Sequence, residues 1–455
     1  MKSINPYNGI VLGEFREHDP SDIENILAGA DSAFRHWRNS GFEERQQYLR
    51  SAARLLEERT PALGMLITKE MGKRMGESES EIKKCAWVCK YYADKAREFL
   101  RDEKLPVDEA DSYIAYDPLG PVLAVMPWNF PFWQVFRFAA PAVMAGNTGI
   151  LKHASNVPQC SLAIAQIFHD AGFPEGVFQS VLIPSSTVND LIDDKRIAAV
   201  TLTGSEDAGR SVAAAAGRNI KKSVLELGGS DPFIVLKDAD IDRAARVAAR
   251  ARMINCGQSC IAAKRFIVHR DVSDDFIDIM EEEFLKLSPG DPEAPTTGYG
   301  PMARSDLTQI IEHQVNESIQ NGAKLIMGGK RTDGFNDTFY MPTILKGVKP
   351  GMAAFDEELF GPVAAISAFR DEEEAIGIAN HSGFGLGASL WSRDIEKGKG
   401  IARKIESGSV FINEMVASHP VVPFGGIKMS GYGRELSHLG IREFMNIKSV
   451  WIHKD

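Results

Sequence analysis

Apolar positions along the chain change their spacing near residue 110, and the change separates two kinds of predicted structure. From Asp19 to about Leu100 the apolar residues recur every three or four positions, which is the spacing of amphipathic helices. Residues 21–24 have the residue types of a capping box, so the first helix is expected to begin there. Beyond residue 110, short apolar runs alternate with helical patterns, an order typical of βαβ units and a parallel sheet.

This alternation places the expected elements along the chain. In the first half, strands are expected at residues 112–116, 122–126, 148–151, 178–183 and 198–203, with helices at 133–145, 159–171 and 206–216. After Gly229, strands are expected at residues 233–236, 265–268, 363–369, 386–391 and 410–412. We interpret the second group as a second α/β domain. The last apolar run, 449–453, has no strand beside it in sequence, so it is expected to join a sheet elsewhere, in this or another subunit.

Composition narrows the class of protein. The chain of 455 residues is long enough for about three domains, and its net charge of −10 argues against a nucleic-acid surface. No apolar run has the length of a membrane span, and the first residues lack the apolar core of a signal peptide. Five cysteines are too few for a disulfide framework, so a cytoplasmic location is expected, with neither membrane nor nucleic acid as a partner.

Two short segments combine groups suited to covalent catalysis at a carbonyl carbon. Glu226 ends an apolar run against two glycines, and Cys260 lies in a Gly/Gln/Ser loop just before a predicted strand. They supply a soft nucleophile and a candidate general base. Taken alone, Cys260 is more simply a small buried hydrophobe. Cys85 and Cys89, four residues apart, are interpreted as a buried helix face, and no metal site is expected.

Two other segments follow predicted strands and could contact a phosphate or a ribose. Residues 203–209 turn through glycines into a predicted helix, whose N-terminus would favour a phosphate. The spacing differs from that of the usual dinucleotide fingerprint, and a plain strand-to-helix turn explains it equally well. Lys152, at the end of another predicted strand, offers a cation, although a solvated loop lysine is the commoner reading of such a residue.

Together these residues resemble the aldehyde dehydrogenase superfamily, from near Pro6 to the C-terminus. Five segments match in the family's order, and five matches in order are highly specific: residues 127–131, 225–229, 257–260, 357–362 and 423–431. Residues 130–137 and 431–438 also resemble the short bacterial succinate-semialdehyde dehydrogenases within that family. The resemblance implies an NAD(P)-dependent oxidation of an aldehyde to a carboxylate. Succinate semialdehyde, which gives succinate, is the expected substrate.

The resemblance assigns the catalytic roles. Cys260 is the implied nucleophile, and its thiol pKa, ordinarily near ~8.5, is expected to fall. Asn129 and the Cys260 N–H are implied to hold the oxyanion, and Glu226 is the implied base that activates water for hydrolysis of the thioester. The alternative for Asn129 is a helix N-cap, which is compatible with the same role.

The resemblance also implies the cofactor contacts, which are listed here: Trp128 and Lys152 at the adenosine ribose, Gly204 and Ser205 at the pyrophosphate, and Glu358 and Phe360 at the nicotinamide ribose. NAD-preferring relatives often carry a glutamate where this chain has Ser155. Its absence, with Lys152 retained, leaves room and positive charge for a 2′-phosphate, so NADP is favoured over NAD. Cys256 is a second departure from the family pattern, and we predict that it could form a reversible disulfide with Cys260.

For the substrate, a carboxylate far from the reacting carbonyl calls for a fixed cation. Arg137 lies eight residues beyond Asn129 in the same helical pattern and is the expected anchor, with Ser418 as a second donor and Phe424 nearby. The alternative for Arg137 is a structural ion pair. Other readings of the whole chain are a dehydrogenase for a different aldehyde, an acyl transferase to coenzyme A, which Glu226 disfavours, and a catalytically silent binding protein.

The expected fold is α/β, with two doubly wound α/β domains and a small β arm for oligomerisation. Residues 1–106 and 122–227 are assigned to the cofactor-binding domain, and residues 228–423 to the catalytic domain. Residues 107–121 and 424–455 are assigned to the arm and the C-terminal strand. On this division the protein is expected to be a homodimer or homotetramer.

Overall fold

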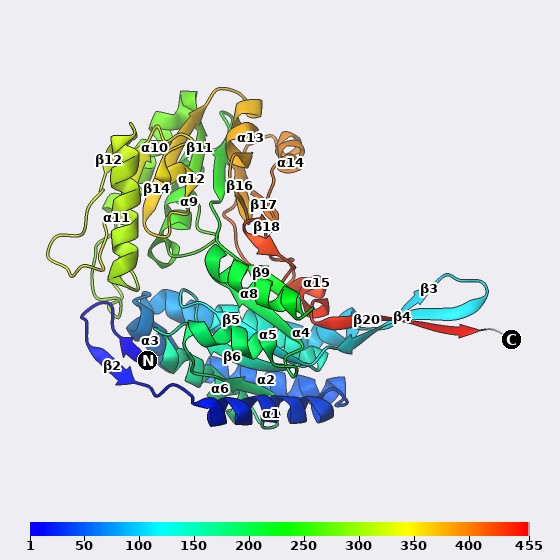
Figure 1. Cartoon of the computed structure of the whole chain (residues 1–455). Helices are drawn as coiled ribbons and strands as arrows, with labels where there is room; N and C mark the ends of the chain where they lie inside the picture. Colours follow the sequence, from blue (N-terminus) through cyan, green and yellow to red (C-terminus); the bar gives the residue numbers. More distant parts are fainter. Residues whose placement is uncertain (454–455) are drawn as a thin grey trace.

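A computed structural model describes residues 1–453 as two sheet-based domains and a projecting three-stranded arm (Figure 1). The two large sheets are mainly parallel and carry helices on their faces. The predicted fold class, two doubly wound α/β domains with a small β arm, is therefore confirmed. No helix within residues 1–453 is long and apolar enough to cross a membrane.

The N-terminal helices pack against the first domain. They are α1 (Pro20–Trp37), α2 (Phe42–Glu58), α3 (Thr60–Met71) and α4 (Met75–Phe99), in agreement with the helical pattern. The predicted start of α1 was two residues late, because the cap is Asp19 rather than Ser21. Asp19 accepts hydrogen bonds from the N–H groups of Ser21 and Asp22, and the Asp22 carboxylate accepts from Asp19 N–H. The short hairpin of β1 (Lys2–Ile4) and β2 (Val11–Glu14) was not predicted.

The first domain is built on a six-stranded sheet of order β19-β9-β8-β5-β6-β7. Its parallel strands are β5 (Pro121–Met126), β6 (Thr148–His153), β7 (Phe178–Ser180), β8 (Ala199–Thr203) and β9 (Lys222–Glu226). The connecting helices are α5 (Trp133–Ala145), α6 (Pro158–Asp170), α7 (Val188–Asp193) and α8 (Glu206–Arg218). β7 is shorter than predicted, because the chain leaves the sheet towards the 3₁₀ turn Ser185–Thr187. The antiparallel edge strand β19 (Gly431–Tyr432) returns from the distant C-terminal region.

The second domain is built on a seven-stranded sheet of order β12-β13-β14-β11-β10-β16-β17. The strands are β10 (Pro232–Val235), β11 (Arg265–His269), β12 (Lys324–Met327), β13 (Thr343–Lys346), β14 (Val363–Phe369), β16 (Gly387–Trp391) and β17 (Ser409–Ile412). The helices are α9 (Ile241–Met253), α10 (Ser273–Leu285), α11 (Ser305–Gln320), α12 (Ala353–Asp356), α13 (Glu372–Asn380) and α14 (Ile395–Ala402). The predicted strands of this half are all present. The edge pair β12 and β13 was missed, since its apolar runs are short.

The arm consists of β3 (Glu103–Leu105), β4 (Ala110–Pro118) and β20 (Met445–His453), and it extends away from both domains (Figure 1). β20 pairs antiparallel with β4 of its own chain along its whole length, so the terminal strand finds its partner in this subunit. Its outer face leaves Trp451 59% and Ile447 60% exposed. An apolar surface of this kind on a projecting sheet is typical of an interface.

The C-terminal region before β20 lies against the body of the protein. β18 (Ile427–Lys428) pairs with β15 (Phe384–Gly385), and α15 (Ser437–Arg442) packs on α4 and α5. The three-stranded sheet also begins at Glu103, ahead of the predicted start of the arm at residue 107. Cys85 and Cys89 are fully buried in α4, as their helical spacing predicted.

Candidate functional site

Cys260 lies where two cavities meet. The first, which we call the helix-side cavity, has a volume of about 310 Å³ and is lined by side chains of α4 and α5 and by residues 415–418. The second, the sheet-side cavity, has a volume of about 330 Å³ and is lined by residues that follow β5, β8 and β9. Of the residues lining them, Cys260 and Gln134 belong to both. The thiol can therefore be approached from two sides.

Left-handed backbone conformations set the shape of the loop that carries Cys260. Asn255, Cys256 and Gly257 all have left-handed backbone angles, with φ of 51°, 54° and 75°. At Gly257 a side chain cannot be accommodated, because a Cβ atom would lie 2.1 Å from the carbonyl oxygen of Gly361. This left-handed run turns the chain sharply from α9 into the loop before β11.

Lys264 fixes the second half of the loop. Its buried ammonium donates hydrogen bonds to the carbonyl oxygens of Ser259, Cys260 and Ala262, at 3.0, 2.8 and 3.2 Å. Lys264 also lies 3.3 Å from the carboxylate of Glu358. Burial lowers the pKa of Lys264, while the Glu358 charge opposes that shift. The sequence gives no indication of this role beyond a lysine four residues after a cysteine.

The Cys260 thiol is only partly exposed, and burial raises its pKa to about 12. The positive charges of Lys264 and Arg137 act in the opposite direction, by stabilising the thiolate. The predicted fall of this pKa is therefore not present in this state of the protein. The thiol is protonated at neutral pH, and its proton has to leave before or during nucleophilic attack.

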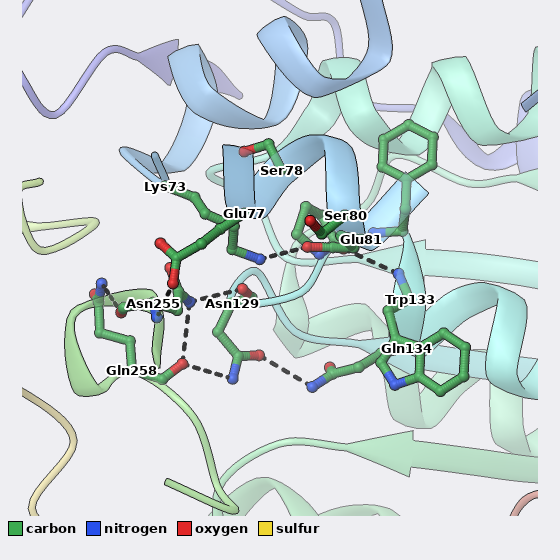
Figure 2. A network of polar contacts seen from close by, with 12 residues as sticks. Lys73, Glu77, Ser78, Ser80, Glu81, Asn129, Trp133, Gln134, Asn255 and Gln258 are labelled. Carbon is green, nitrogen blue, oxygen red and sulfur yellow. Dashed lines mark hydrogen bonds and ion pairs between the residues drawn. The ribbon is translucent and has the colours of Figure 1, made fainter. Parts of the chain in front are cut away.

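Asn129 is held beside Cys260 by a network of amides (Figure 2). Its Nδ2 donates to the carbonyl oxygen of Gln258 at 3.1 Å, and its Oδ1 accepts from Nε2 of Gln134 at 3.1 Å. Asn255 Nδ2 donates to the carbonyl oxygens of both Asn129 and Gln258. Because Gln134 donates to Oδ1, the Asn129 amide can present only its N–H₂ group as a donor.

The second N–H of Asn129 has no acceptor among residues 1–453, and neither does the backbone N–H of Cys260. Two such donors beside a nucleophile are the components of an oxyanion hole. The alternative role of Asn129 as an N-cap is not observed, because the cap of α5 is Phe132.

Helix α5 is oriented by a buried acid of α4. Glu81 accepts hydrogen bonds from the N–H groups of Phe132 and Trp133, at 2.8 and 3.0 Å, and forms a buried ion pair with Lys73. A carboxylate at a helix N-terminus satisfies the free N–H groups and complements the helix dipole. Through this contact with Trp133 (Figure 2), Glu81 sets the position of α5, the helix that carries Gln134 and Arg137.

Glu226 ends β9, as predicted, but its side chain lines neither cavity. Neither carboxylate oxygen has a hydrogen-bond partner among residues 1–453, and a Cβ atom built on Gly425 would lie 2.8 Å from Oε1. Burial raises the pKa of Glu226 well above its usual range, and the neighbouring charge of Glu435 adds to the shift, while Arg137 opposes it. The structure therefore does not bring Glu226 into the cavity beside Cys260.

Arg137 lines the helix-side cavity, but its charge is already balanced. The guanidinium forms a buried ion pair with Glu435, and its Cζ lies 4.6 Å from the centre of the Phe424 ring. The structural ion pair considered as the alternative for Arg137 is thus present. Phe424 and Ser418 line the same cavity, as expected.

The helix-side cavity contains a second cation that was not predicted. Lys84 on α4 donates from Nζ to the hydroxyl of Ser418 at 2.7 Å, and its Nζ lies 4.2 Å from the centre of the Trp133 ring. The sequence signal for this residue is weak but present: Lys84 adjoins the buried stripe of α4 that contains Glu81, Cys85 and Val88.

The sheet-side cavity brings together most of the predicted cofactor residues. Trp128, Gly204, Ser205, Glu358 and Phe360 line it. The Trp128 and Phe360 rings meet edge to face with centroids 5.8 Å apart, and Ser205 caps α8. Arg304, which the sequence did not indicate, also lines this cavity with its guanidinium 5.8 Å from the Trp128 ring.

Lys152 and Ser155 lie further along the same edge of the sheet, at and after the end of β6. Lys152 is buried and donates only to Ser185 Oγ at 3.3 Å, without an ion pair to any carboxylate of residues 1–453. Burial lowers the pKa of Lys152. Ser155 is exposed and uncharged.

The predicted pairing of Cys256 with Cys260 remains a prediction, because both thiols are free in the structure. Cys256 packs among the apolar residues of the second domain, whereas Cys260 lines the cavities. In residues 1–453 no group of three His, Cys, Asp or Glu side chains is arranged to hold a metal ion.

Comparison with known proteins identifies this arrangement. The sequence profile of the aldehyde dehydrogenase family matches residues 1–450. The chain belongs to the aldehyde dehydrogenase family. This confirms the resemblance drawn from the five sequence segments.

Several relatives within the aldehyde dehydrogenase family are similar over the whole chain. A probable succinate-semialdehyde dehydrogenase (NADP(+)) of Synechocystis sp. is 52% identical over 452 residues, covering 99% of both chains. A succinate-semialdehyde dehydrogenase (NADP(+)) of Mycobacterium avium is 49% identical, covering 99% of this chain and 96% of its own. Among solved structures, a succinic semialdehyde dehydrogenase from Streptococcus pyogenes in complex with NADP+ has a TM-score of 0.97 at 39% identity, with full coverage of both chains.

Proposed function

We propose that the protein oxidises succinate semialdehyde to succinate with NADP+ through a covalent adduct on Cys260. The observation that carries this proposal is the position of Cys260 where the two cavities meet, since a hydride acceptor and an aldehyde must both reach the same thiol-bound carbon. The named activity of relatives about half identical over their whole length supports the choice of substrate.

In the first half of the reaction, the Cys260 thiol loses its proton to water, Sγ attacks the aldehyde carbon, and the electron pair of the C=O bond moves to the oxygen, which becomes an oxyanion. The free N–H of Asn129 and the backbone N–H of Cys260 would stabilise this oxyanion. Their positions depend on Gln134 and Lys264, respectively. When bound, NADP+ supplies the acceptor for the hydride that leaves the thiohemiacetal carbon.

In the second half, water attacks the thioester that remains on Cys260, and Glu226 takes the proton of that water. For this step the Glu226 side chain has to turn from Gly425 towards Cys260. The raised pKa of Glu226 is consistent with a buried resting position, and entry into a hydrated cavity would lower it. The products are the carboxylate and the free thiol.

The residues of the sheet-side cavity, with Lys152 and Ser155 further along the same edge of the sheet, fit a dinucleotide. Lys152 is a buried cation without a carboxylate partner in residues 1–453, and a phosphate or ribose oxygen would satisfy it. Ser205 begins α8 with free N–H groups close to Gly204, where a pyrophosphate can approach the main chain. The uncharged Ser155 favours NADP, because a glutamate at this position would repel a 2′-phosphate.

We further propose that the protein assembles through its arm as a homodimer or homotetramer. The exposed Ile447, Trp451 and Ile452 of β20 support this, since isolated subunits would leave them in water. Light scattering should give the mass of the assembly, and Trp451→Lys should shift it towards the monomer. The cytoplasmic location expected from the cysteine content stays a prediction.

The proposed reaction is tested with the purified protein, succinate semialdehyde and either NADP+ or NAD+. NADPH should form in a one-to-one ratio with succinate, with NADP+ preferred. A panel of uncharged aldehydes gives the substrate preference. Absence of succinate with either cofactor, from protein that is folded, would refute the proposal.

A further inference from the structure

We propose that Lys84 of α4, together with the hydroxyl of Ser418, binds the carboxylate of the substrate at the far end of the helix-side cavity. The inference rests on the proposed oxidation of an aldehyde at Cys260 and specifies which cation selects a substrate of negative charge. It differs from the expectation drawn from the sequence, which placed Arg137 in this role.

The position of Lys84 supports the inference. Lys84, Ser418 and Cys260 line the same cavity, so an aldehyde that reaches the thiol lies in the compartment into which the ammonium projects. Trp133 and Ile261 add apolar surface to the same cavity. A short chain with an aldehyde at one end and a carboxylate at the other matches this combination of polar, apolar and cationic groups.

The bonding of Lys84 leaves its charge uncompensated. Its Nζ contacts only the Ser418 hydroxyl and the face of the Trp133 ring, and Lys84 forms no ion pair with any carboxylate of residues 1–453. The next residue on the helix, Lys83, is exposed and does pair with Glu79. A mostly enclosed cation without a counter-ion is unfavourable unless a ligand supplies the negative charge.

The nearest acid of α4 cannot neutralise Lys84. Both oxygens of Glu81 are already used, one by Lys73 and the other by the N–H groups at the start of α5. Burial, and after it the charge of Arg137, lower the pKa of Lys84 to about 8. A bound carboxylate would reverse this effect by favouring the ammonium form.

Arg137 is placed differently in the same cavity. Its guanidinium is nearly fully buried and pairs with Glu435, so the pair as a whole carries little net charge towards the cavity. Ser418 adds a second polar contact on the side of Lys84. Its oxygen accepts from Lys84, and its own proton has no acceptor among residues 1–453, so the hydroxyl is free to donate to a carboxylate.

The inference is tested by the ratio of kcat/KM for succinate semialdehyde to kcat/KM for butanal, an uncharged aldehyde of the same chain length. Lys84→Met keeps the length of the side chain and removes its charge. The ratio should fall by about 10- to 100-fold, the range expected for a lost charge-assisted hydrogen bond. Lys84→Arg should keep most of the ratio, and Lys83→Met, on the exposed side of the same helix, should leave it unchanged.

A binding measurement separates this inference from the proposed reaction, because it does not depend on turnover. Iodoacetamide alkylates Cys260, and succinate should slow this alkylation in the native protein and in Lys83→Met but not in Lys84→Met. If Lys84→Met keeps both the substrate ratio and the protection, the inference is wrong and the dehydrogenase activity still stands. If the native protein oxidises no aldehyde but succinate protects it through Lys84, the proposed function fails and the anion site remains.

Discussion

The two cavities that meet at Cys260 are built from different parts of the fold. The sheet-side cavity is lined mainly by residues that follow strands β5, β8 and β9, where main-chain groups and glycines come close to the open space. The helix-side cavity is lined by side chains from α4, from α5 and from residues 415–418, three segments that are far apart in sequence. The first is thus shaped by strand ends and the second by individual side chains.

On the proposed function, this difference would separate recognition of the cofactor from recognition of the aldehyde. Carboxyl ends of parallel strands meet at one edge of a sheet, so a dinucleotide site there follows from the topology itself. Side chains that project from packed helices can change without moving the sheet, and they set the polarity of the substrate cavity one residue at a time. Cys260 and Gln134 line both cavities and therefore connect the two sites.

The largest effect on activity is expected at Cys260, where the two cavities meet. Cys260→Ala removes the only thiol among residues 1–453 that lines either cavity, so no covalent adduct can form, and kcat should fall by about 10⁴-fold or more. NADPH formation with succinate semialdehyde measures this loss. Cys256→Ala is the matched control and should keep most of the activity, because Cys256 is buried away from the cavities. Activity retained in Cys260→Ala, with the fold intact, would show that the reaction needs no covalent adduct on Cys260.

Gln134 also belongs to both cavities, and we expect it to position Asn129 rather than to touch the reacting atoms. Gln134→Leu removes the donor that fixes the Asn129 amide, so kcat should fall by about 10- to 100-fold with little change in KM. Gln166→Leu, an exposed change on α6, is the control. A kcat that stays at the native value would mean that Asn129 is oriented without Gln134.

How much of this site the sequence predicts follows from the same contrast. Cys260, Glu226 and most residues of the sheet-side cavity lie in short contiguous segments beside predicted strands, and those segments are recognisable in the sequence. Lys84 lies in the middle of a helix, and its hydrogen-bond partner Ser418 follows 334 residues later in the chain. No local pattern encodes that contact, and only the packing of α4 against the C-terminal region creates it.

The ion pair of Arg137 with Glu435 could not be predicted from the sequence either. The sequence supplied the arginine and many acids, and the fold alone selects which acid becomes its partner. The resting direction of the Glu226 side chain is similar in kind, since β9 fixes only its backbone. The position of a residue can therefore be predicted where a motif and a strand end coincide, and it cannot be predicted where two distant side chains meet.

The two cations of the helix-side cavity can be distinguished by changing Arg137. Arg137→Ala leaves Glu435 buried without a partner, which is expected to cost about 3–5 kcal/mol of unfolding free energy. Succinate semialdehyde and butanal should lose kcat/KM to a similar degree, because the damage is structural. Denaturant unfolding and paired kinetics measure both effects. Unchanged stability with a loss confined to succinate semialdehyde would restore Arg137 as the carboxylate anchor and contradict the role of Lys84.

At the edge of the first sheet, Ser155→Glu tests whether strand-end residues set cofactor choice. A carboxylate at this exposed position would lie where the 2′-phosphate is expected, and repulsion between like charges should lower the NADP-to-NAD ratio of kcat/KM by about 10- to 100-fold. The aldehyde preference should stay constant, since the position is remote from the helix-side cavity. Equal use of both cofactors by the native protein, with no change on substitution, would disprove the role of Ser155.

The smallest expected effect is a pH dependence of carboxylate binding in the helix-side cavity. The titratable groups that face Lys84 are Cys85 and Glu81 on its own helix, Lys73 before it and Arg137 on α5. With a pKa of about 8, the ammonium of Lys84 is mostly present at pH 7 and mostly lost at pH 9. The affinity for a substrate carboxylate should therefore fall as pH rises through this range.

Ionisation of Cys260 and Glu226 changes kcat/KM equally for both aldehydes. Its effect therefore cancels in the ratio of kcat/KM for succinate semialdehyde to kcat/KM for butanal. This ratio should decrease by about tenfold from pH 7 to pH 9, as the charged fraction of one group with a pKa near 8 does. In Lys84→Met the ratio should already be low and independent of pH. In Lys84→Arg it should stay high across the range, because a guanidinium keeps its charge. A ratio that fell equally in the native protein and in Lys84→Met would assign the titration to another group and remove this support for the anion site.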